Sequence, residues 1–555
     1  MPADAAAHAA APDELAAFLE APTSYPHAPG SVELVRTHLS LVALAGRFVF
    51  KAQKPVDLGF ADFSTLDKRE QACREEVRLN RRLCADTYEG VAPIYREGDE
   101  GALTFAETDG APVAFTVKMH RLAEGGFLDE QIDAGAAGED DLERVARRLA
   151  AFYREQESTP DVAAQGRPER LRVSTDENFD QTEVHADTDV LPRPAFDALR
   201  YYTNRFLDQR AALLHRRCAE GRVVEGHGDL RLEHVHLAHA ETKGSGEGVC
   251  IYDCVAFNER LRAVDAAGDA AGDAAFLAMD LDFHGAPGLA RYFVRRLAEL
   301  LEDPGLLALI DFYKTYRAYV RVKVDLLQSE DEDLSAEKRD EQRDRARRHV
   351  QQAVRYATAG SGPAVVAVMG RAGTGKSTQA QALADLLGAD YAASDRTRKD
   401  LAGLPPRERP DDAAREQLYA PEMTERTYAA LCDRALDAAR QHRPVVLDAT
   451  FGKRRHRDRL REALHDASST NGADDIPHCF VELTASDDTI KARLADRAGA
   501  DALSDARRED FAMLAAGYEA PLALEDARHV AVPTDEGDGV DAVTTAVLKH
   551  LVRHL

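Results

Sequence analysis

An apolar run that leads into a glycine-rich loop constrains this chain more than any other feature. Residues 365–378 read Val-Val-Ala-Val-Met-Gly-Arg-Ala-Gly-Thr-Gly-Lys-Ser-Thr. They match the phosphate-binding pattern G-x-x-x-x-G-K-S, in which a strand precedes the loop and a helix follows it. Glycine lets such a loop curl until successive backbone N–H groups point at phosphate oxygens. We therefore expect an α/β domain with a parallel sheet and a nucleotide bound at this loop.

Within the loop, two side chains carry specific expectations. Lys376 is expected to reach the β- and γ-phosphates of ATP, and Ser377 is expected to hold Mg²⁺. The remaining candidate contacts with the nucleotide come from the same segment: Gly370, Arg371, Ala372, Gly373, Thr374, Gly375 and Thr378. The loop thus predicts the cofactors ATP and Mg²⁺ for the C-terminal part of the chain.

Composition limits the class of protein. At 555 residues the chain is too long for one ordinary domain, and about two or three are expected. No apolar run approaches the ~20 residues needed to cross a bilayer, so no membrane partner is expected. The net charge of −26 argues against a surface that coats nucleic acid. Seven cysteines form no C-x-x-C pair, which favours reduced thiols and a cytoplasmic location over zinc or disulfide sites.

Changes of composition along the chain suggest where its domains begin and end. A charged stretch over 329–348 lacks Gly and Pro and reads as a solvated helix or linker, and Gly-Ser-Gly-Pro at 360–363 then breaks the chain. The expected parts are an Ala-rich tail with a short helix over 1–24, a first domain over 25–330, a charged helical linker over 331–362 and a P-loop domain over 363–555.

A second group of charged residues lies far upstream of the P-loop. Gly226-His227-Gly228-Asp229 is followed, after a short hairpin, by the apolar strand end Ile251-Tyr252-Asp253. A loop with His-Gly-Asp and a later strand that delivers a second Asp has the layout of a protein-kinase-like catalytic centre. Asp229 would accept the proton of an attacking hydroxyl. Asp253 would bind the Mg²⁺ that bridges ATP phosphates.

Two more residues upstream fit the same layout. Lys51 ends the strand-like run Phe48-Val49-Phe50 and would pair with ATP phosphates. Glu76 lies in a stretch with helical periodicity and would hold that lysine in an ion pair. Glu75 and Lys54 are the alternatives for these two roles.

The order of these features along the chain is a strand Lys, a helix Glu, a His-Gly-Asp loop and a strand-end Asp. In this order the N-terminal part, over about 30–330, resembles the aminoglycoside-phosphotransferase-like kinases. That resemblance implies an α+β protein-kinase-like domain. A longer set of segments resembles a bacterial group in which such a module is fused to a P-loop kinase-like ATPase in one bifunctional chain. These segments are 37–40, 51–56, 59–64, 78–81 and 273–277.

The chain departs from the kinase pattern at two places. The pattern puts an Asn five residues after the catalytic Asp as a second metal ligand, and His234 stands there instead. Imidazole is a poor ligand for Mg²⁺, which prefers oxygen, so His234 is a doubtful metal ligand. A G-x-G-x-x-G loop is also absent near residues 30–50. These departures leave open a pseudokinase. His227 is expected to hydrogen-bond within the loop rather than to act as a base.

Four charged residues downstream of the P-loop are expected to complete the C-terminal site. Asp395 follows a strand and would deprotonate or orient an acceptor hydroxyl. Asp448 ends a buried-type strand and either holds Mg²⁺ through water or caps the strand end. Arg493 and Arg497 stand four residues apart on a helix and would share one face. Their spacing resembles the lid arginines of small P-loop kinases, and residues 363–555 resemble the gluconate-kinase and polynucleotide-5′-kinase branch.

The sequence therefore predicts an ATP- and Mg²⁺-dependent phosphotransferase with two nucleotide sites. The acceptor would be a small hydroxylated molecule or a nucleic acid 5′ end. Two alternatives stay open: a nucleotide-sensing regulator with an N-terminal pseudokinase, and an ATPase coupled to a binding partner.

Overall fold

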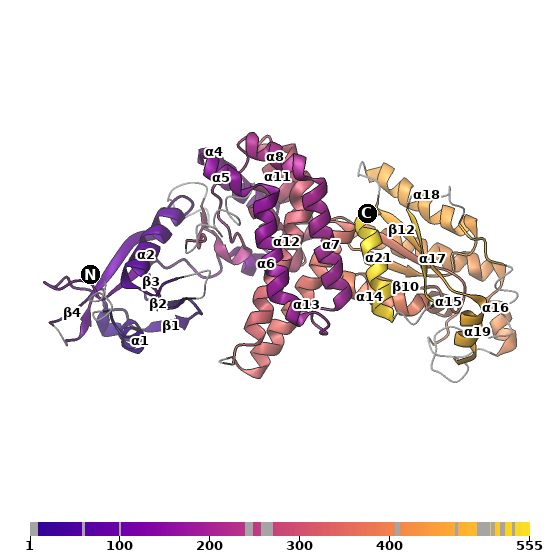
Figure 1. The fold of residues 1–555 in the computed structure, drawn as a ribbon, viewed down its shortest axis with the longest axis horizontal. Helices are drawn as coiled ribbons and strands as arrows, with labels where there is room; N and C mark the ends of the chain where they lie inside the picture. The colour runs from indigo at the N-terminus through magenta and orange to yellow at the C-terminus, as the bar shows by residue number, and fades with distance from the viewer. Residues whose placement is uncertain are drawn as a thin grey trace. The chain divides into compact units, whose positions relative to one another are not determined.

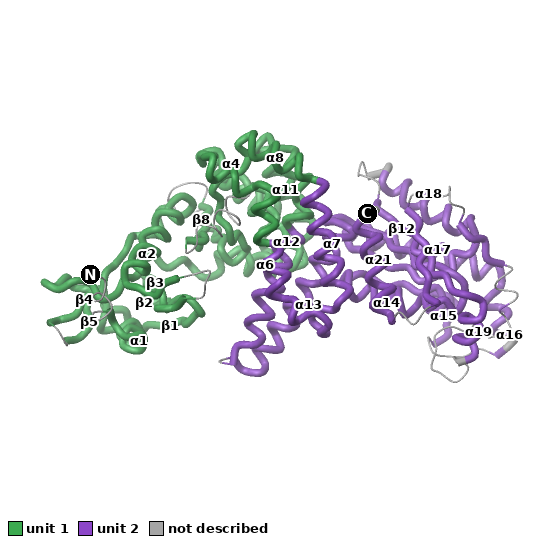
Figure 2. Tube along the Cα trace, viewed as in Figure 1, with its two compact units in different colours: residues 1–174, 210–313 green, residues 175–209, 314–555 purple. Residues whose placement is uncertain are grey.

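The structure is a computed structural model of the chain. It describes residues 9–57, 62–98, 101–238, 248–256, 270–332, 334–405, 411–471, 476–496, 511, 517–521, 528–535 and 539–554. These residues form two compact units. Unit 1 comprises 1–174 and 210–313, and unit 2 comprises 175–209 and 314–555 (Figure 2).

The N-terminal part of unit 1 contains an antiparallel sheet (Figure 1). Its strand order is β1-β2-β3-β6-β4-β5. Helix α2, over Leu66–Asn80, contacts this sheet. Thr65 caps its first turn, because the threonine hydroxyl accepts the N–H of Lys68. The strands are β1 Val32–Arg36, β2 Ser40–Ala45, β3 Phe48–Gln53, β4 Tyr88–Arg96, β5 Leu103–Thr104 and β6 Ala114–His120.

The rest of unit 1 is mainly helical and contains one short hairpin. The hairpin pairs β7, over Val235–Leu237, with β8, over Val249–Ile251. It carries the two candidate aspartates of this unit on its flanks. The helices are α1 Pro12–Glu20, α3 Leu128–Asp133, α4 Glu139–Glu155, α5 Pro160–Gln165, α8 Ala211–Ala219, α10 Ala270–Phe283 and α11 Pro287–Leu300, while α6 Pro168–Thr182 continues into unit 2.

Unit 2 contains a five-stranded sheet in the order β10-β11-β9-β12-β13, and every neighbouring pair is parallel. The expected parallel sheet is therefore confirmed. All five residues of β9 are buried, as strands covered on both faces require. The strands are β9 Val365–Met369, β10 Asp390–Ala393, β11 Val445–Asp448, β12 His478–Thr484 and β13 His529–Pro533.

Helices cover both faces of this sheet. Alternate residues of β9, beginning with Val365, pack in one core with helices α17 and α18, so the opposite face is left for α14 and α21, which also contact the strands. The helices of unit 2 are α7 Arg193–Gln209, α13 Ala336–Ala359, α14 Lys376–Leu387, α15 Ser394–Leu401, α16 Asp412–Leu418, α17 Pro421–Arg440, α18 Arg454–Asn471, α19 Asp487–Asp496 and α21 Val540–His554, together with most of α12 Ile310–Ser329, which begins in unit 1.

The units divide the chain at other places than composition suggested. The charged stretch forms α13, whose second half is buried and which contacts α7, α14 and α21 within unit 2. Unit 2 therefore includes helices that precede residue 331. Charge alone did not indicate this, because the apolar face of a helix decides what it packs against. The expected domain boundary between 330 and 362 stays a prediction.

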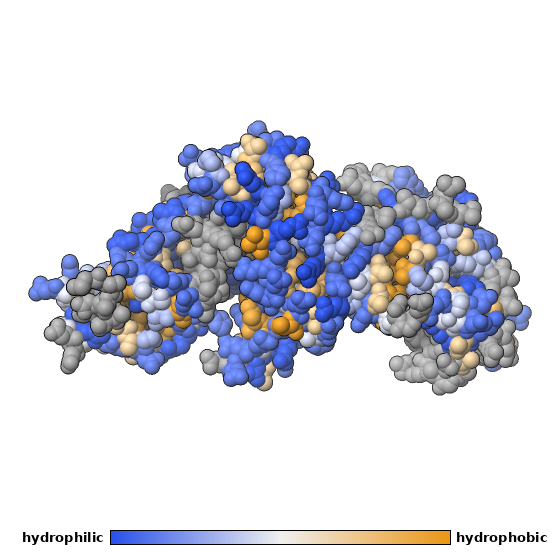
Figure 3. Space-filling model, in the orientation of Figure 1, coloured by the Kyte–Doolittle hydropathy of each residue, from blue (hydrophilic) through white to orange (hydrophobic). Residues whose placement is uncertain are grey.

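The face in Figure 3 is largely hydrophilic with small apolar patches. Among the described residues, no helix combines the length and the apolar composition that spanning a membrane requires.

Helices α12 and α13 bury an ionic group. Nδ1 of His349 lies 2.7 Å from Oδ2 of Asp325, and Arg321 donates a hydrogen bond to the other carboxylate oxygen at 3.0 Å. Burial, together with the charges of Arg321 and Arg345, lowers the pKa of His349 below its ordinary value, although Asp325 acts to raise it. Burial would raise the pKa of Asp325, but His349 and Arg321 hold it below its ordinary range. The folded state thus favours a neutral imidazole beside a carboxylate.

We expect the chain to lose stability as the pH falls below about 6.5, the ordinary pKa of histidine. The unfolded chain takes up a proton on His349 there, whereas the folded chain does so only at lower pH, so acid favours unfolding. Thermal melting at about pH 7.5 and about pH 5.5 should show a drop of a few degrees. The drop is measured for each protein between its own midpoints at the two pH values, and it should be smaller in His349→Gln than in the unaltered protein. Equal drops in both proteins would contradict this role of His349.

Candidate functional site

Lys51 forms ion pairs with two carboxylates of unit 1. It lies on β3, and its Nζ is 3.0 Å from Oε1 of Glu76 on α2 and 2.8 Å from Oδ1 of Asp253, just after β8. Burial would lower the pKa of Lys51, but the two carboxylates raise it above its ordinary value. The structure thus brings together three of the residues singled out from the sequence.

The two alternatives for these roles make other contacts. Lys54 is exposed and donates a hydrogen bond to the carbonyl of Thr37. Glu75 pairs with Arg78 on the outer face of α2. Neither of these bonds involves the group around Lys51.

The two carboxylates that bind Lys51 have pKa values shifted in opposite directions. Burial raises the pKa of Glu76, and the neighbouring charge of Asp253 adds to this increase. Burial would raise the pKa of Asp253 as well, but Lys51 and then His234 lower it to about 2. Asp253 is therefore ionised near neutral pH and can receive a cation.

Asp273 of α10 holds the loop that carries Asp229. Its carboxylate accepts the N–H groups of His227 at 2.7 Å and Gly228 at 2.9 Å, and the hydroxyl of Tyr153 at 2.8 Å. A buried carboxylate with three donors fixes the backbone immediately before the candidate base. The sequence offered no sign of this role. Asp273 was noted only as part of segment 273–277, which resembles the bacterial group of fused kinases.

His227 stabilises the loop in the way expected of it. It is fully buried, and the N–H of Asp229 donates to its Nδ1 at 3.2 Å. Nε2 therefore carries the ring proton and donates to the carbonyl of Tyr252 at 2.8 Å. Both ring nitrogens bond the backbone, so His227 ties the Asp229 loop to the segment that leads into Asp253.

Arg231 binds the carboxylate of the candidate base. Its Nε lies 3.2 Å from Oδ1 of Asp229 and its Nη2 lies 3.1 Å from Oδ2. A guanidinium that holds both oxygens weakens a carboxylate as a proton acceptor. An attacking hydroxyl would have to displace part of this contact. Sequence reasoning missed Arg231, although it stands two residues after Asp229.

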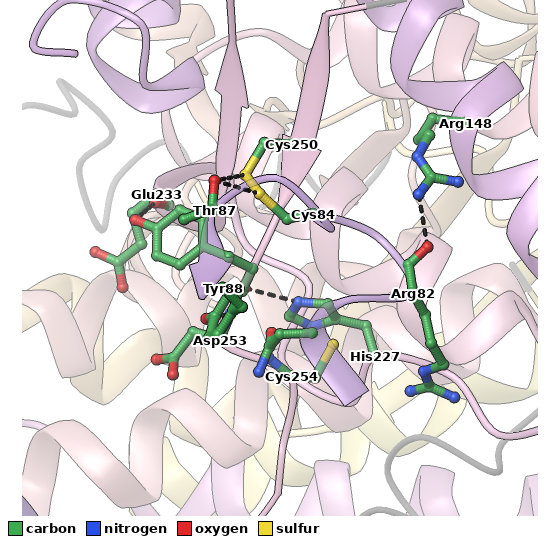
Figure 4. The surroundings of a disulfide bond; sticks show 12 residues. Arg82, Cys84, Thr87, Tyr88, Arg148, His227, Glu233, Cys250, Asp253 and Cys254 are labelled. Atoms are coloured by element: carbon green, nitrogen blue, oxygen red, sulfur yellow. Dashed lines mark hydrogen bonds between the residues drawn. A yellow bond between two sulfur atoms is a disulfide. The ribbon is translucent and has the colours of Figure 1, made fainter. Parts of the chain in front are cut away.

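A disulfide lies in the same region as His227 and Asp253 (Figure 4). It links Cys84, in the turn after α2, to Cys250 of β8, with Cα atoms 4.7 Å apart. The expectation of reduced thiols throughout was wrong for this pair. The two cysteines are 166 residues apart, so spacing along the chain gave no sign of the bond. The bond joins the segment after the Glu76 helix to the strand that precedes Asp253.

The P-loop of unit 2 has the geometry that phosphate binding requires. Gly370, Gly373 and Gly375 have φ of +136°, +87° and +91°, which side chains rarely tolerate. A Cβ on Gly370 would lie 2.4 Å from the carbonyl of Leu483. Helix α14 starts at Lys376, so its first N–H groups face the loop and favour an anion there. Lys376 Nζ donates to the carbonyl of Arg371 at 3.0 Å. These residues fit ATP phosphates.

Tyr391 connects the two candidate metal-binding side chains of unit 2. Its hydroxyl donates to Oδ2 of Asp448 at 2.9 Å. Burial is the main reason that the pKa of Tyr391 is raised, and the negative charges of Asp448 and then of Asp395 raise it further. A hydrogen bond with Ser377 lowers it. Asp448 is buried and ends β11, which pairs with the strand that leads into the P-loop. Sequence reasoning found three of these four residues and missed Tyr391.

Arg493 lies beside the P-loop. It belongs to α19 and donates to Oγ1 of Thr534 at 3.0 Å and to the carbonyl of the same residue at 2.5 Å. Thr534 in turn donates to the carbonyl of Thr374 in the loop at 3.1 Å. Arg497 lies outside the described residues, so its expected partnership with Arg493 stays a prediction.

Asp395 is the second residue of α15, directly after β10.

A family model matches the C-terminal part of the chain, and two relatives match most of its length. A family model described as an AAA domain matches residues 365–521. Uncharacterized protein Rv2004c of Mycobacterium tuberculosis (strain H37Rv) and uncharacterized protein Mb2027c of Mycobacterium bovis are each 31% identical over 494 residues. Each alignment covers 87% of this chain and 90% of the relative.

Solved kinase structures show weaker likeness. A gluconokinase from Sinorhizobium meliloti is 23% identical over 34% of this chain and 94% of its own, with a TM-score of 0.25. A choline/ethanolamine kinase family protein from Mesorhizobium loti is 14% identical over 61% of this chain and 98% of its own, with a TM-score of 0.36. Likenesses at this level do not decide function. The mycobacterial match is both closer and longer, and the chain belongs to the family of these mycobacterial proteins.

Proposed function

We propose that the chain is an ATP- and Mg²⁺-dependent phosphotransferase with a kinase-like nucleotide site in unit 1 and a P-loop kinase site in unit 2. The observation that carries the proposal is the group around Tyr391. Tyr391 binds Asp448 at the end of β11, and β10 ends beside it at Ala393, so Asp395 follows two residues later at the same end of the sheet where the P-loop begins. A simple nucleotide clamp needs no carboxylate for an acceptor at that place, whereas phosphoryl transfer to a hydroxyl does.

At the C-terminal site the roles follow from charge and position. Lys376 and the backbone of the P-loop hold the β- and γ-phosphates, and Ser377 and Asp448 would hold Mg²⁺, which neutralises charge on those phosphates. Asp395 orients or deprotonates the acceptor hydroxyl. Arg493 and Arg497 act on the transferring phosphoryl group.

At the N-terminal site the same chemistry uses another set of side chains. Lys51 pairs with ATP phosphates while Glu76 holds its ammonium group in place, and Asp253 would bind the metal ion. Asp229 accepts the proton of the attacking hydroxyl. The ion pairs of Lys51 with both carboxylates support this assignment.

One observation favours a second candidate function, a nucleotide-sensing regulator. Arg231 binds both carboxylate oxygens of Asp229, and His234 replaces the asparagine of the kinase pattern. A base held in this way suits a unit that binds ATP and transfers phosphate slowly. In that case only the C-terminal site would turn over.

A screen of hydroxylated acceptors with labelled ATP tests the proposed function. The panel should include sugars, amino alcohols and a 5′-hydroxyl oligonucleotide. Asp395→Ala should lower transfer at the C-terminal site by ~10²–10⁴-fold, because the acceptor loses its proton acceptor, while ATP binding persists. Asp400→Ala removes a half-exposed carboxylate from the same helix and should leave transfer unchanged. Steady ATP hydrolysis without transfer to any acceptor would favour the ATPase alternative.

A further inference from the structure

The imidazole of His234 is held in one orientation between the two aspartates of unit 1. Its Nδ1 lies 2.7 Å from the backbone carbonyl oxygen of Asp229, and a carbonyl oxygen only accepts. Nδ1 therefore carries a ring proton. Nη2 of Arg231, which can only donate, lies 3.3 Å from Nε2, so Nε2 carries a lone pair. The side chain is only 7% exposed, so this orientation is fixed by its surroundings.

Nε2 of His234 lies near two carboxylates, that of Glu233 at 3.7 Å and that of Asp253. Nε2 lies 3.8 Å from Oδ2 of Asp253, whose other oxygen is bound to Lys51. Asp253 has a φ of +62°, an uncommon value for Asp that is retained where the surroundings require it, often at functional sites. Two ligands of one ion at ~2.1 Å each lie between ~3 and ~4 Å apart, so one ion can contact both atoms with little movement.

We propose that Nε2 of His234 and Oδ2 of Asp253 are the protein ligands of the metal ion that accompanies ATP in unit 1, and that they select a divalent transition-metal ion over Mg²⁺. The inference rests on the proposed function, in which unit 1 binds ATP. Imidazole suits transition-metal ions, whereas Mg²⁺ prefers oxygen. A metal-binding histidine commonly donates its other N–H to a backbone carbonyl, as His234 does.

The site is incomplete without the nucleotide. Among the residues that the structure describes, no group of three or more His, Cys, Asp or Glu side chains could hold an ion. Phosphate oxygens of ATP would supply the remaining ligands. Nη2 of Arg231 lies 3.3 Å from Nε2 of His234, so the guanidinium must turn away to admit an ion, and it then gives up the bond of Nη2 to Oδ2 of Asp229. The replacement of Asn by His then alters the metal preference of the site rather than inactivating it.

Mn²⁺ together with a non-hydrolysable ATP analogue tests the inference in the full chain. Lys376→Ala is included in every protein to weaken the P-loop site. Pulsed electron paramagnetic resonance should detect a ¹⁴N coupling to bound Mn²⁺. Labelling the histidines with ¹⁵N should replace it by a ¹⁵N coupling, which excludes the adenine ring as its source. The coupling should be lost in His234→Asn.

Affinity gives a second, independent readout. The analogue should bind at least about tenfold more tightly with Mn²⁺ than with Mg²⁺, and His234→Asn should remove most of this difference. His215→Asn is the matched control, since it removes a half-exposed imidazole that faces Glu169, and it should change neither readout.

The outcomes separate two kinds of failure. Binding of the analogue with equal affinity in both metal ions and without a histidine ¹⁴N coupling would overturn the metal assignment and leave the kinase-like site intact. No binding with either ion would overturn the nucleotide site of unit 1 itself, and the metal assignment with it. The coupling in the protein that retains His234 can be read even where His234→Asn fails to fold.

Discussion

Lys376→Ala is expected to lower phosphotransfer at the C-terminal site by ~10²–10³-fold. The ammonium group stands at the first residue of α14, where it would meet the charge that builds up on the transferring phosphate. Rates measured with saturating ATP and an acceptor from the screen give the effect. Lys338→Ala, which removes an exposed lysine from another helix of unit 2, should leave the rate unchanged.

The same variant also tests whether the two sites work independently. Any turnover that depends on Asp229 should persist in Lys376→Ala, because the two sites are built from residues of different compact units. Loss of both activities in the single variant would contradict independent sites.

Asp229→Asn is expected to lower phosphotransfer at the N-terminal site by ~10²–10⁴-fold with little change in ATP affinity. The amide keeps the shape of the side chain but cannot take the proton of an attacking hydroxyl. The comparison is made in the Lys376→Ala background, so that the C-terminal site contributes little to the rate. Asp133→Asn serves as the control, since it alters an exposed carboxylate of the same unit that faces His284.

Two results would argue against this role of Asp229. Unchanged turnover in Asp229→Asn would show that another group is the base. A Lys376→Ala protein that binds ATP but transfers no phosphate would favour the regulator, in which Arg231 keeps Asp229 unavailable.

Features that depend on local pattern could be predicted from the sequence. The P-loop and its flanking strand carry their own signature, because a tight anion-binding turn needs glycine at fixed positions. The pairing of Lys51 with Glu76 could be inferred from the order of motifs, without any knowledge of the sheet. Asp448 could be singled out because it ends an apolar strand-like run, and the structure pairs that strand with β9.

Features that depend on contacts between distant segments could not. Tyr391 reaches Asp448 across 57 residues, and Asp273 reaches the loop before Asp229 across 45 and 46 residues. Cys84 and Cys250 are further apart still. Single residues of these types occur throughout the chain, and nothing in their immediate neighbours marks the few that meet in space.

The number of ATP analogues bound per chain tests the central claim most directly. Calorimetric titration of the full chain, with Mg²⁺ and Mn²⁺ both present, should give two equivalents for the unaltered protein and one for Lys376→Ala. Asp253→Asn should also bind one, and the double variant should bind none. A single equivalent in the unaltered protein, lost completely in Lys376→Ala, would contradict a nucleotide site in unit 1 and leave the P-loop as the chain's only nucleotide site.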